Sequence, residues 1–515
     1  MAFQAQTFHD KPFRITNSLE GYKKVEFKPL NAPQVLFYSC GPTVYGPLHI
    51  GNARSLYMPN LMSRWLRHIG YDVNFVLNYT DVDDKIINRS KQEGIPPEDV
   101  AQKYVDYCET DMKLMGLSKP TRTVRVTETM DDIVAIVEKL IERKHAYVVN
   151  GEVLYSVESF KGYGKLSGKN IEELQAGARV EVGAHKRNPM DFSVWKPHKP
   201  GEPHWPSPWS EGRPGWHIEC SAMIRKWLGD TIDIHHGGQD LIFPHHENEI
   251  AQSEGATGKP FCKYWIHTAF LTISREKMSK SLGNILEIRP FIEKFGAEVL
   301  KYLFVKHHYR TPFDFNAESL EEILSELERI YLARKWALEA VQEGLGADSS
   351  HSAHAGKAFA GLRGRGEKTF RALEDEMFND LNSPGALGHL FTLIRDINRA
   401  EGESAGKSGL KAPASAERLQ VAADFLQLLD QGFKPILNVF GDNPGDMMQQ
   451  IEKIRRNRNP LAMTLSDEDI LKFIEERKQS RLSKNFQRAD EIRKELEAQG
   501  IILVDSPQGT TWKLK

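Results

Sequence analysis

Two apolar runs with a helix-length segment between them constrain the fold of this chain most strongly. Residues 35–38 and 73–77 are short and almost entirely apolar, which is typical of strands buried on both faces of a parallel sheet. Gly70 is placed to end a helix between them, whose apolar residues at helical spacing are Leu56, Leu61, Trp65 and Leu66. The order strand, helix, strand predicts the βαβ unit of a Rossmann-type nucleotide-binding fold.

The start of this predicted helix carries the sequence Leu-His-Ile-Gly-Asn at residues 48–52. Backbone amides at a helix N-terminus and the positive end of the helix dipole favour phosphate. His49, Gly51 and Asn52 are therefore candidates for binding a nucleotide. Taken alone, an ordinary βαβ unit that binds no ligand explains the segment better.

A second segment with a phosphate-binding composition lies far along the chain. Residues 277–281 read Lys-Met-Ser-Lys-Ser, with Gly283 close behind. The ammonium groups of Lys277 and Lys280 can neutralise charge that builds up as a phosphorus–oxygen bond breaks. Taken alone, a solvated surface loop is the commoner explanation of such a composition.

Composition limits the class of protein. A chain of 515 residues can hold three or four domains, and no apolar run approaches the roughly 18 residues that span a bilayer. Residues 1–6 show no secretory signal. The scattered cysteines argue for a reducing compartment, so we expect a cytoplasmic protein with no membrane contact; they are Cys40, Cys108, Cys220 and Cys262. The net charge of −2 indicates no particular partner.

Changes of pattern along the chain predict an α/β domain split by an insertion, then an α-helical bundle and a small α+β unit. The expected parts are the first half of the Rossmann-type domain at 1–125, a connective insertion at 126–205, the second half with the lysine-rich loop at 206–300, a helical region at 301–450 and a C-terminal domain at 451–515. Two Gly/Ala/Ser-rich stretches, 344–366 and 401–416, are predicted to be flexible loops.

The last 50 or so residues predict a separate unit of two helices and a strand. Ser466 is a candidate N-cap, and the apolar residues that predict the two helices are Ile470, Phe473 and Ile474, then Ala489, Ile492 and Leu496. The second helix is expected to end at Gly500, and residues 501–504 follow as a strand.

Residues 48–52 and 277–281 together resemble the paired signature sequences of class I aminoacyl-tRNA synthetases. The usual second histidine of the first signature is Asn52 here, whose side-chain amide can still donate a hydrogen bond to phosphate or ribose. Other segments are similar to one family of this class, the cysteinyl-tRNA synthetases; they are residues 40–45, 78–85, 213–221, 243–249 and 507–512. The resemblance covers nearly the whole chain and is weakest in the two Gly/Ala/Ser-rich stretches.

The resemblance implies one zinc ion per chain. His245 and Glu249 are four residues apart, so on a helix they share one face, although a polar helix start explains this spacing at least as well. The family's zinc ligands match Cys40, Cys220, His245 and Glu249, and the thiolate of a cysteine substrate can complete the shell. A zinc–sulfur bond distinguishes cysteine from serine better than pocket shape does, so the resemblance implies no editing domain.

The resemblance also implies roles for other residues. ATP with Mg²⁺ would bind at His49, Gly51, Asn52 and Lys280, with Lys277 and Lys280 stabilising the departing pyrophosphate. The amino-acid pocket would include Gly41, Thr80, Trp216 and Asp240, with Asp240 meeting the ammonium group. Contacts to anticodon bases are implied for Arg481, Asp490 and Asp505. The expected partners are tRNA(Cys), L-cysteine and ATP, and we expect a monomer.

Simpler explanations compete at several positions. Asp240 could cap a turn, and the three anticodon candidates could belong to a solvated helix face. His236 stands where the family often has glycine, which puts close backbone approach to a ligand in question. We assign Asp81, Asp83 and Asp84 to helix capping and a salt bridge with Lys85, not to a second metal site. Cys108 and Cys262 are predicted to pack in the core.

Two other functions remain open on the sequence. One is a ligase that activates cysteine in the same way but joins it to an amino-sugar; such enzymes lack the anticodon-reading end, so residues 466–515 favour tRNA. The other is a non-catalytic RNA-binding protein that keeps a zinc-stabilised nucleotide fold. The candidate catalytic residues and metal ligands argue against the second, because a pure binder has no need of them.

Overall fold

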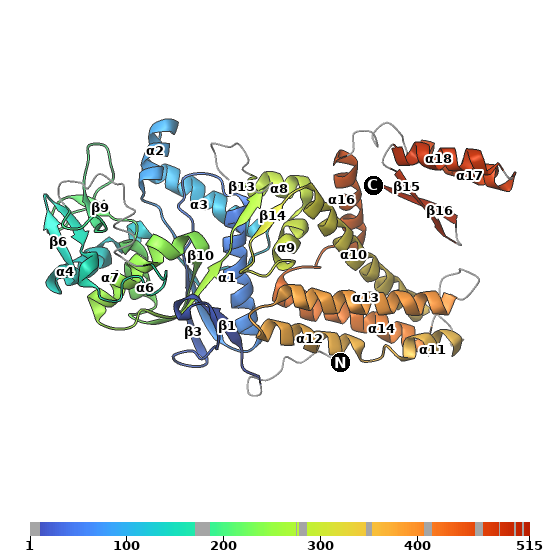
Figure 1. The fold of residues 1–515 in the computed structure, drawn as a ribbon, viewed down its shortest axis with the longest axis horizontal. Helices are drawn as coiled ribbons and strands as arrows, with labels where there is room; N and C mark the ends of the chain where they lie inside the picture. The colour runs from blue at the N-terminus through green and yellow to red at the C-terminus, as the bar shows by residue number, and fades with distance from the viewer. Residues whose placement is uncertain are drawn as a thin grey trace.

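The computed structural model describes residues 11–169, 186–273, 276–277, 286–346, 353–405, 415–458, 467–483, 485–498, 501–506 and 509–514. The molecule is long, with the insertion at one end, the α/β domain next to it, and the helical region and C-terminal unit at the other end (Figure 1). Among the described helices, none combines the length and apolar character that a membrane span requires.

A five-stranded parallel sheet organises the α/β domain, in the order β11-β10-β3-β4-β5. Its strands are β3 (Gln34–Ser39), β4 (Asp72–Tyr79), β5 (Arg122–Arg125), β10 (Ile232–Gly238) and β11 (Cys262–Thr268). The chain winds from β3 outward to β5 and later returns to β10 on the other side of β3. Open α/β sheets bind ligands at such a reversal, beyond the carboxyl ends of the strands.

The predicted βαβ unit is confirmed. Helix α1 (Ile50–His68) joins β3 to β4 and buries its apolar side, including Leu61, Trp65 and Leu66. The chain then turns at Gly70, whose φ of 90° lies in the region that favours glycine. Helices α2 (Asp84–Glu93) and α3 (Pro97–Leu114) follow β4.

The insertion contains a helix and a four-stranded antiparallel sheet in the order β6-β7-β8-β9. Its elements are α4 (Met130–Glu142), β6 (Ala146–Val149), β7 (Glu152–Tyr155), β8 (Phe192–Pro197) and β9 (Gly212–Pro214). The sheet extends past residue 205, because β9 pairs with β8 at Trp195 and Pro214. Helices α6 (Ile218–Trp227) and α7 (Glu247–Thr257) contact α4 and join the insertion to the α/β domain.

A small sheet carries the start of the lysine-rich segment. Strand β12 (Leu271–Ile273) pairs with β13 (Glu276–Lys277) on one side and with β14 (Phe313–Phe315) on the other. Helices α8 (Ile288–Phe295) and α9 (Ala297–Val305) lie between β13 and β14 in the sequence. The N-terminal hairpin is β1 (Arg14–Asn17) and β2 (Lys23–Glu26).

The helical region is confirmed, but the prediction of flexible loops within it is wrong where the chain is described. Its helices are α10 (Ala317–Gly346), α11 (Ala353–Ala360), α12 (Arg365–Phe378), α13 (Ser383–Ala405), α14 (Ala416–Gln427), α15 (Lys434–Leu437) and α16 (Pro444–Arg458). Much of 344–366 and the start of 401–416 are therefore helical. Alanine is the strongest helix former, and Phe359 anchors α11 in the core.

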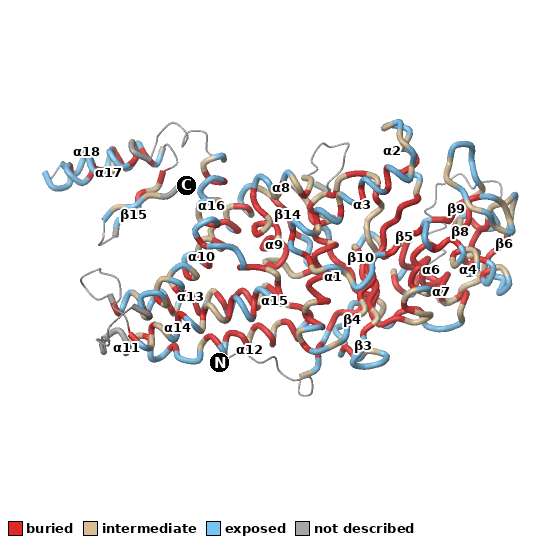
Figure 2. Tube along the Cα trace, turned by 180° about the vertical axis from the view of Figure 1, so that it is seen from behind, coloured by how far each residue is buried: buried red, intermediate tan, exposed pale blue. Residues whose placement is uncertain are grey.

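The C-terminal unit has the two predicted helices and the predicted strand, a second strand that was not predicted, and its own core. These elements are α17 (Asp467–Leu482), α18 (Phe486–Ala498), β15 (Ile501–Ser506) and β16 (Gly509–Leu514). The core consists of Ile470, Ile492, Leu496, Ile501 and Leu503. Figure 2 shows that most of the surface of α17 and α18 is exposed. The predicted cap Ser466 and the predicted helix end Gly500 lie outside the described residues.

Candidate active site

A cavity of about 750 Å³ opens beyond the carboxyl ends of β3, β4 and β10. It brings together candidates that are up to about 200 residues apart in the sequence; those in its wall are Cys40, Gly41, His49, Asn52, Thr80, Trp216, Cys220, Asp240 and His245. Gly51 is in the first turn of α1 and Glu249 is in α7, and neither lines the cavity. The site therefore occupies the reversal point of the sheet.

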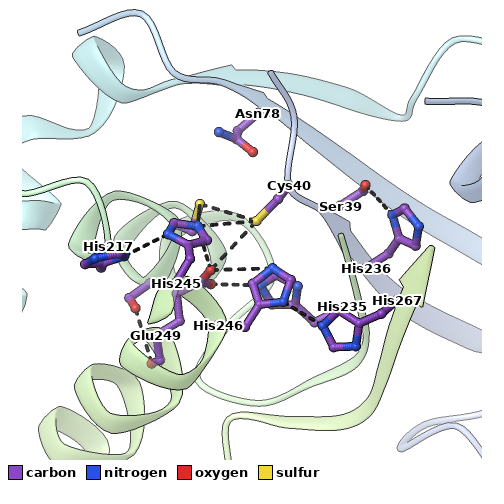
Figure 3. Close-up of polar contacts among 12 residues, drawn as sticks. Ser39, Cys40, Asn78, His217, His235, His236, His245, His246, Glu249 and His267 are labelled. Atoms are coloured by element: carbon purple, nitrogen blue, oxygen red, sulfur yellow. Dashed lines mark hydrogen bonds and ion pairs between the residues drawn. The ribbon is translucent and has the colours of Figure 1, made fainter. Parts of the chain in front are cut away.

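Four candidate metal ligands converge beside this cavity (Figure 3). The sulfur of Cys40 lies 3.7 Å from the Cys220 sulfur, 3.7 Å from His245 Nε2 and 3.7 Å from Glu249 Oε1. The Cys220 sulfur is also 3.7 Å from His245 Nε2, which is 2.9 Å from Glu249 Oε1. Cys40 follows β3, and Cys220 lies in α6. His245 lies in the turn before α7, and Glu249 lies in the first turn of α7.

These distances fit a tetrahedral zinc site. Zinc–sulfur bonds of about 2.3 Å in tetrahedral geometry place two sulfurs about 3.8 Å apart, close to the observed 3.7 Å. Two thiolates, one imidazole and one carboxylate form a donor set that suits a borderline-soft ion. The residues present therefore fit the ion that the sequence resemblance implies.

A second set of possible ligands overlaps the first. It shares Cys40 and Glu249 and adds His235 and His246 in place of Cys220 and His245. His235 Nε2 bonds Glu249 Oε2 at 2.8 Å, so this imidazole supports the carboxylate from behind. Neither His235 nor His246 lines the cavity, whereas Cys40, Cys220 and His245 do. The first set therefore has three of its four ligands in the cavity wall, and the second set has one.

A network of buried and half-buried histidines packs around the four ligands and was not predicted. His217 Nδ1 lies 2.9 Å from His245 Nδ1, and Gln252 donates to the carbonyl of His217 at 2.7 Å. Deeper in the core, His246 Nδ1 lies 2.8 Å from His267 Nε2. Such partners fix the ring orientation of a metal-binding histidine. The density of histidine between residues 235 and 267 was the one sequence signal of this network.

Burial and neighbouring charges set the protonation of this cluster. Burial lowers the pKa of His217 to about 3 and the pKa of His246 well below its usual value, so both imidazoles are neutral. A hydrogen bond from the Cys40 thiol, reinforced by His245, lowers the pKa of Cys220 to about 6 despite its burial. Cys220 is therefore set up to act as a thiolate, the form that binds metal.

The first signature builds the N-terminus of α1. His49 is the N-cap: the amide of Asn52 donates to His49 Nδ1 at 3.2 Å, and the His49 amide donates to Asn52 Oδ1 at 3.1 Å. This reciprocal pair is a capping box, which holds both side chains at the cavity wall. Asparagine in place of the usual histidine thus has a structural role, and its side-chain nitrogen takes no part in the cap.

The amino-acid candidates lie around the metal-ligand cluster. Gly41 has no room for a side chain, because a Cβ there would lie 1.7 Å from the carbonyl oxygen of Asn78. Asn78 Oδ1 accepts from the Gly41 amide at 2.8 Å, and its own amide donates to Thr80 Oγ1 at 3.4 Å. Trp216 stacks on His245 with ring centres 4.5 Å apart, is 38% exposed and lines the cavity. Asp240 follows β10 at the wall.

Two interpretations from the sequence are resolved here. His236 points away from the cavity: its nitrogens lie 2.9 Å from Ser39 Oγ and 2.8 Å from Thr268 Oγ1, and it is fully buried. The side chain of His236 therefore does not occupy the cavity. Cys108 and Cys262 are buried in the core, as predicted.

The acidic run at the end of β4 is structural, but its predicted salt bridge is wrong. Asp83 caps α2 by accepting from the Lys85 amide at 2.8 Å, as expected. Asp81 accepts from Thr127, however, and Asp84 pairs with Arg213 and Lys196. The Lys85 ammonium lies over the Tyr45 ring, since the insertion supplies closer cations to Asp84.

The remaining candidates lie in two other places. Lys277 is in β13, and Lys280 lies outside the described residues. In the C-terminal unit, Arg481 and Asp490 are exposed on α17 and α18. The Asp505 carboxylate accepts two hydrogen bonds from Arg477, at 2.8 and 2.9 Å, which hold its pKa well below its usual range. Arg477 was not singled out from the sequence.

The sheet order, the cavity at its reversal point and the capped α1 are those of a Rossmann-type nucleotide-binding domain, and a family profile shows that it is the catalytic domain of a class I tRNA synthetase. The family profile described as "tRNA synthetases class I (C) catalytic domain" matches residues 26–325, and the profile described as "DALR domain" matches residues 372–430. A solved Mycobacterium tuberculosis methionyl-tRNA synthetase in complex with methionyl-adenylate superposes with a TM-score of 0.58, at 14% identity, over 80% of this chain and 93% of that one. This likeness shows the fold.

Relatives over the full length identify the particular family. A cysteine–tRNA ligase of Geobacter sulfurreducens is 46% identical over 98% of this chain and 99% of its own length. A cysteine–tRNA ligase of Syntrophotalea carbinolica is 45% identical over the same shares of the two chains. The chain belongs to the cysteine–tRNA ligase family, and the resemblance seen in its sequence is confirmed.

Proposed function

We propose that this chain activates L-cysteine with ATP and transfers it to tRNA(Cys), with one zinc ion selecting the substrate thiolate. The convergence of Cys40, Cys220, His245 and Glu249 beside the nucleotide end of α1 carries this proposal. The two alternatives considered from the sequence receive no support from the relatives. We further propose that the protein works as a cytoplasmic monomer.

The wall of the cavity would select the amino acid in two ways. Zinc held by the four ligands would supply a soft Lewis-acid centre that prefers a thiolate to a hydroxyl. Asp240 would pair with the substrate's ammonium group, and Trp216 and Thr80 would cover the small side chain. His217 and His235 hold the ligands His245 and Glu249 in place, which keeps the pocket rigid.

The first reaction step would need positioning and charge stabilisation but no side-chain nucleophile. The carboxylate of cysteine attacks the α-phosphorus of ATP·Mg²⁺, giving cysteinyl-adenylate and releasing pyrophosphate. His49 and Asn52 at the start of α1 would hold phosphate and adenosine, aided by the helix dipole. Lys277 and Lys280 would stabilise the negative charge of the departing pyrophosphate.

The second step would transfer the aminoacyl group to a terminal ribose hydroxyl of tRNA. The hydroxyl oxygen attacks the carbonyl carbon of the adenylate, and AMP leaves. The C-terminal unit, with Arg481, Asp490 and Asp505, would read the anticodon from the far end of the molecule (Figure 1). Because Asp505 is held by Arg477, we infer that Arg477 orients this carboxylate toward the bases.

Two assays test the proposed function together. Cysteine-dependent exchange of pyrophosphate into ATP measures the first step, and charging of purified tRNA(Cys) measures both. We expect both activities in the full-length protein. Exchange without tRNA charging would point to another acceptor, and absence of exchange would overturn the proposal.

Replacing Arg481 by alanine is expected to lower kcat/KM for tRNA charging by about tenfold or more while leaving pyrophosphate exchange within about twofold. Loss of one good base-edge contact costs about 1–3 kcal/mol, which corresponds to a factor of this size. Lys478→Ala is the matched control, because Lys478 lies on the same helix and pairs with Glu475. Equal charging by the two variants would contradict an anticodon role for Arg481.

A further inference from the structure

Arg54 is a buried cation in the second turn of α1 with an unusual set of partners. Its side chain is 1% exposed, and its two terminal nitrogens donate to five backbone carbonyl oxygens. Nη1 bonds the carbonyls of Ala269 and Phe270 at 2.9 and 3.0 Å. Nη2 bonds those of His308, Tyr309 and Thr311 at 3.0, 3.3 and 2.9 Å.

The five carbonyls belong to two segments that lead into one small sheet. Residues 269–270 immediately precede β12, and residues 308–311 precede β14, which pairs with β12. Strand β12 also pairs with β13, where Lys277 lies. The ring of Phe313, at the start of β14, lies 4.6 Å from the guanidinium carbon. A single side chain of α1 therefore fixes the segments that lead into β12 and β14, and β12 is the strand that pairs with β13 and Lys277.

Residues 286–288, which follow the lysine-rich segment in the sequence, are bonded to the same helix. The amide of Ile50 donates to the carbonyl of Leu286 at 2.9 Å, and the amide of Ile288 donates to the carbonyl of Leu48 at 2.9 Å. These bonds form a β-bridge between His49 and Glu287 at the N-terminus of α1. Residues 269–270 and residues 286–288, which flank Lys277 in the sequence, are thus both bonded to α1.

Burying the charge of Arg54 in this position lowers the stability of the fold. Among the described residues no carboxylate forms an ion pair with it, so its charge is balanced only by carbonyl dipoles and the face of Phe313. Burial lowers its pKa to about 9, which leaves it protonated at neutral pH. Buried charges are ordinarily paired, and an apolar side chain would fill a helix–sheet contact at lower cost.

We propose that Arg54 is a positioning residue that sets strand β13, and with it Lys277, relative to the nucleotide-binding end of α1. The proposal rests on the proposed function, in which Lys277 and Lys280 act on the departing pyrophosphate while His49 and Asn52 hold the nucleotide. Residues 269–270, which precede β12, and residues 286–288 are both bonded to α1, so a rigid clamp at Arg54 sets the position of Lys277 relative to His49. A misplacement of about 1 Å can cost about 10²-fold in rate.

The test is Arg54→Lys, which keeps the charge but loses the planar fork that reaches both segments. We expect kcat for cysteine-dependent pyrophosphate exchange to fall by about tenfold or more per folded molecule. The KM for cysteine and the zinc content should stay within about twofold, because the metal ligands lie on other elements. The folded fraction is measured by circular dichroism and thermal unfolding of the same samples.

Arg418→Lys is the matched control for the loss of a buried arginine. Arg418 is also 1% exposed, but it lies in α14 and pairs with Glu401 and Glu343. We expect this variant to lose thermal stability while its exchange rate per folded molecule stays within about twofold. Phe313→Leu, which removes the ring beside Arg54, gives a milder disturbance of the clamp should Arg54→Lys fold poorly, and we expect it to lower kcat in the same way.

A double variant separates positioning from general stability. If Arg54 acts through Lys277, Arg54→Lys combined with Lys277→Ala exchanges no more slowly than Lys277→Ala alone, within about twofold. Multiplied losses, or a wild-type kcat in folded Arg54→Lys, would overturn the proposal. Wild-type exchange by Lys277→Ala would instead refute the proposed role of Lys277 itself.

Discussion

Replacing Lys280 by alanine lowers the rate of cysteinyl-adenylate formation by about 10²-fold or more, with little change in the KM for cysteine. The ammonium group of Lys280 is proposed to meet charge that develops on pyrophosphate only as the bond to the α-phosphorus breaks. Removing one preorganised charge contact of this kind typically costs about 10²–10³-fold in kcat. Initial rates of pyrophosphate exchange at saturating cysteine and ATP measure the effect.

A nearby lysine serves as the control for this experiment. Lys294 is exposed on α8, close in sequence to the lysine-rich segment, and does not line the cavity. Lys294→Ala should exchange pyrophosphate at nearly the wild-type rate. If Lys280→Ala also stays within a few-fold of wild type, the assignment of Lys280 to the transition state is incorrect.

Replacing Cys220 by alanine is expected to remove most of the bound zinc and to lower cysteine activation by more than about 10²-fold. Changing a residue that only supports a metal ligand costs about 10–100-fold in affinity or activity, so loss of a ligand should exceed that range. The variant would also lack the Cys220 thiolate, which Cys40 and His245 stabilise in the unchanged protein. Metal analysis and pyrophosphate exchange on the same preparation measure both effects.

Cys262 offers the matched control for Cys220. It is also a buried cysteine, but its thiol donates to carbonyl oxygens in the sheet, Asp233 at 3.6 Å and Tyr264 at 3.3 Å, and it does not line the cavity. Cys262→Ala should keep its zinc and most of its activity. Equal zinc content in the two variants would show that Cys220 is not a ligand.

The fold was predictable from the sequence where local pattern and burial agree. The runs at 35–38 and 73–77 became β3 and β4, and the helix between them became α1, because each buries an apolar face that its residue spacing already displays. The stretch at 344–366 was misjudged because glycine suggested flexibility, while its alanines and the buried Phe359 favour a helix.

The site was predictable only through the resemblance to a known family. Spacing alone related His245 to Glu249, but Cys40 and Cys220 reach them through sheet topology, which no local pattern encodes. The supporting histidines and Arg54 escaped notice for the same reason: their partners are backbone groups and side chains far away in the sequence. The sequence shows which residues have side chains that can bind a metal or a substrate. The fold determines which of them lie close together.

Selection of a thiolate by a bound metal is most directly tested by measuring zinc in the purified full-length protein together with activation of cysteine and serine. We expect about one zinc per chain, and a ratio of kcat/KM for cysteine over serine of about 10⁴ or more, the range seen where a site recognises a functional group directly. A protein without zinc that discriminates as well, or one that forms seryl-adenylate as readily as cysteinyl-adenylate, would contradict this account.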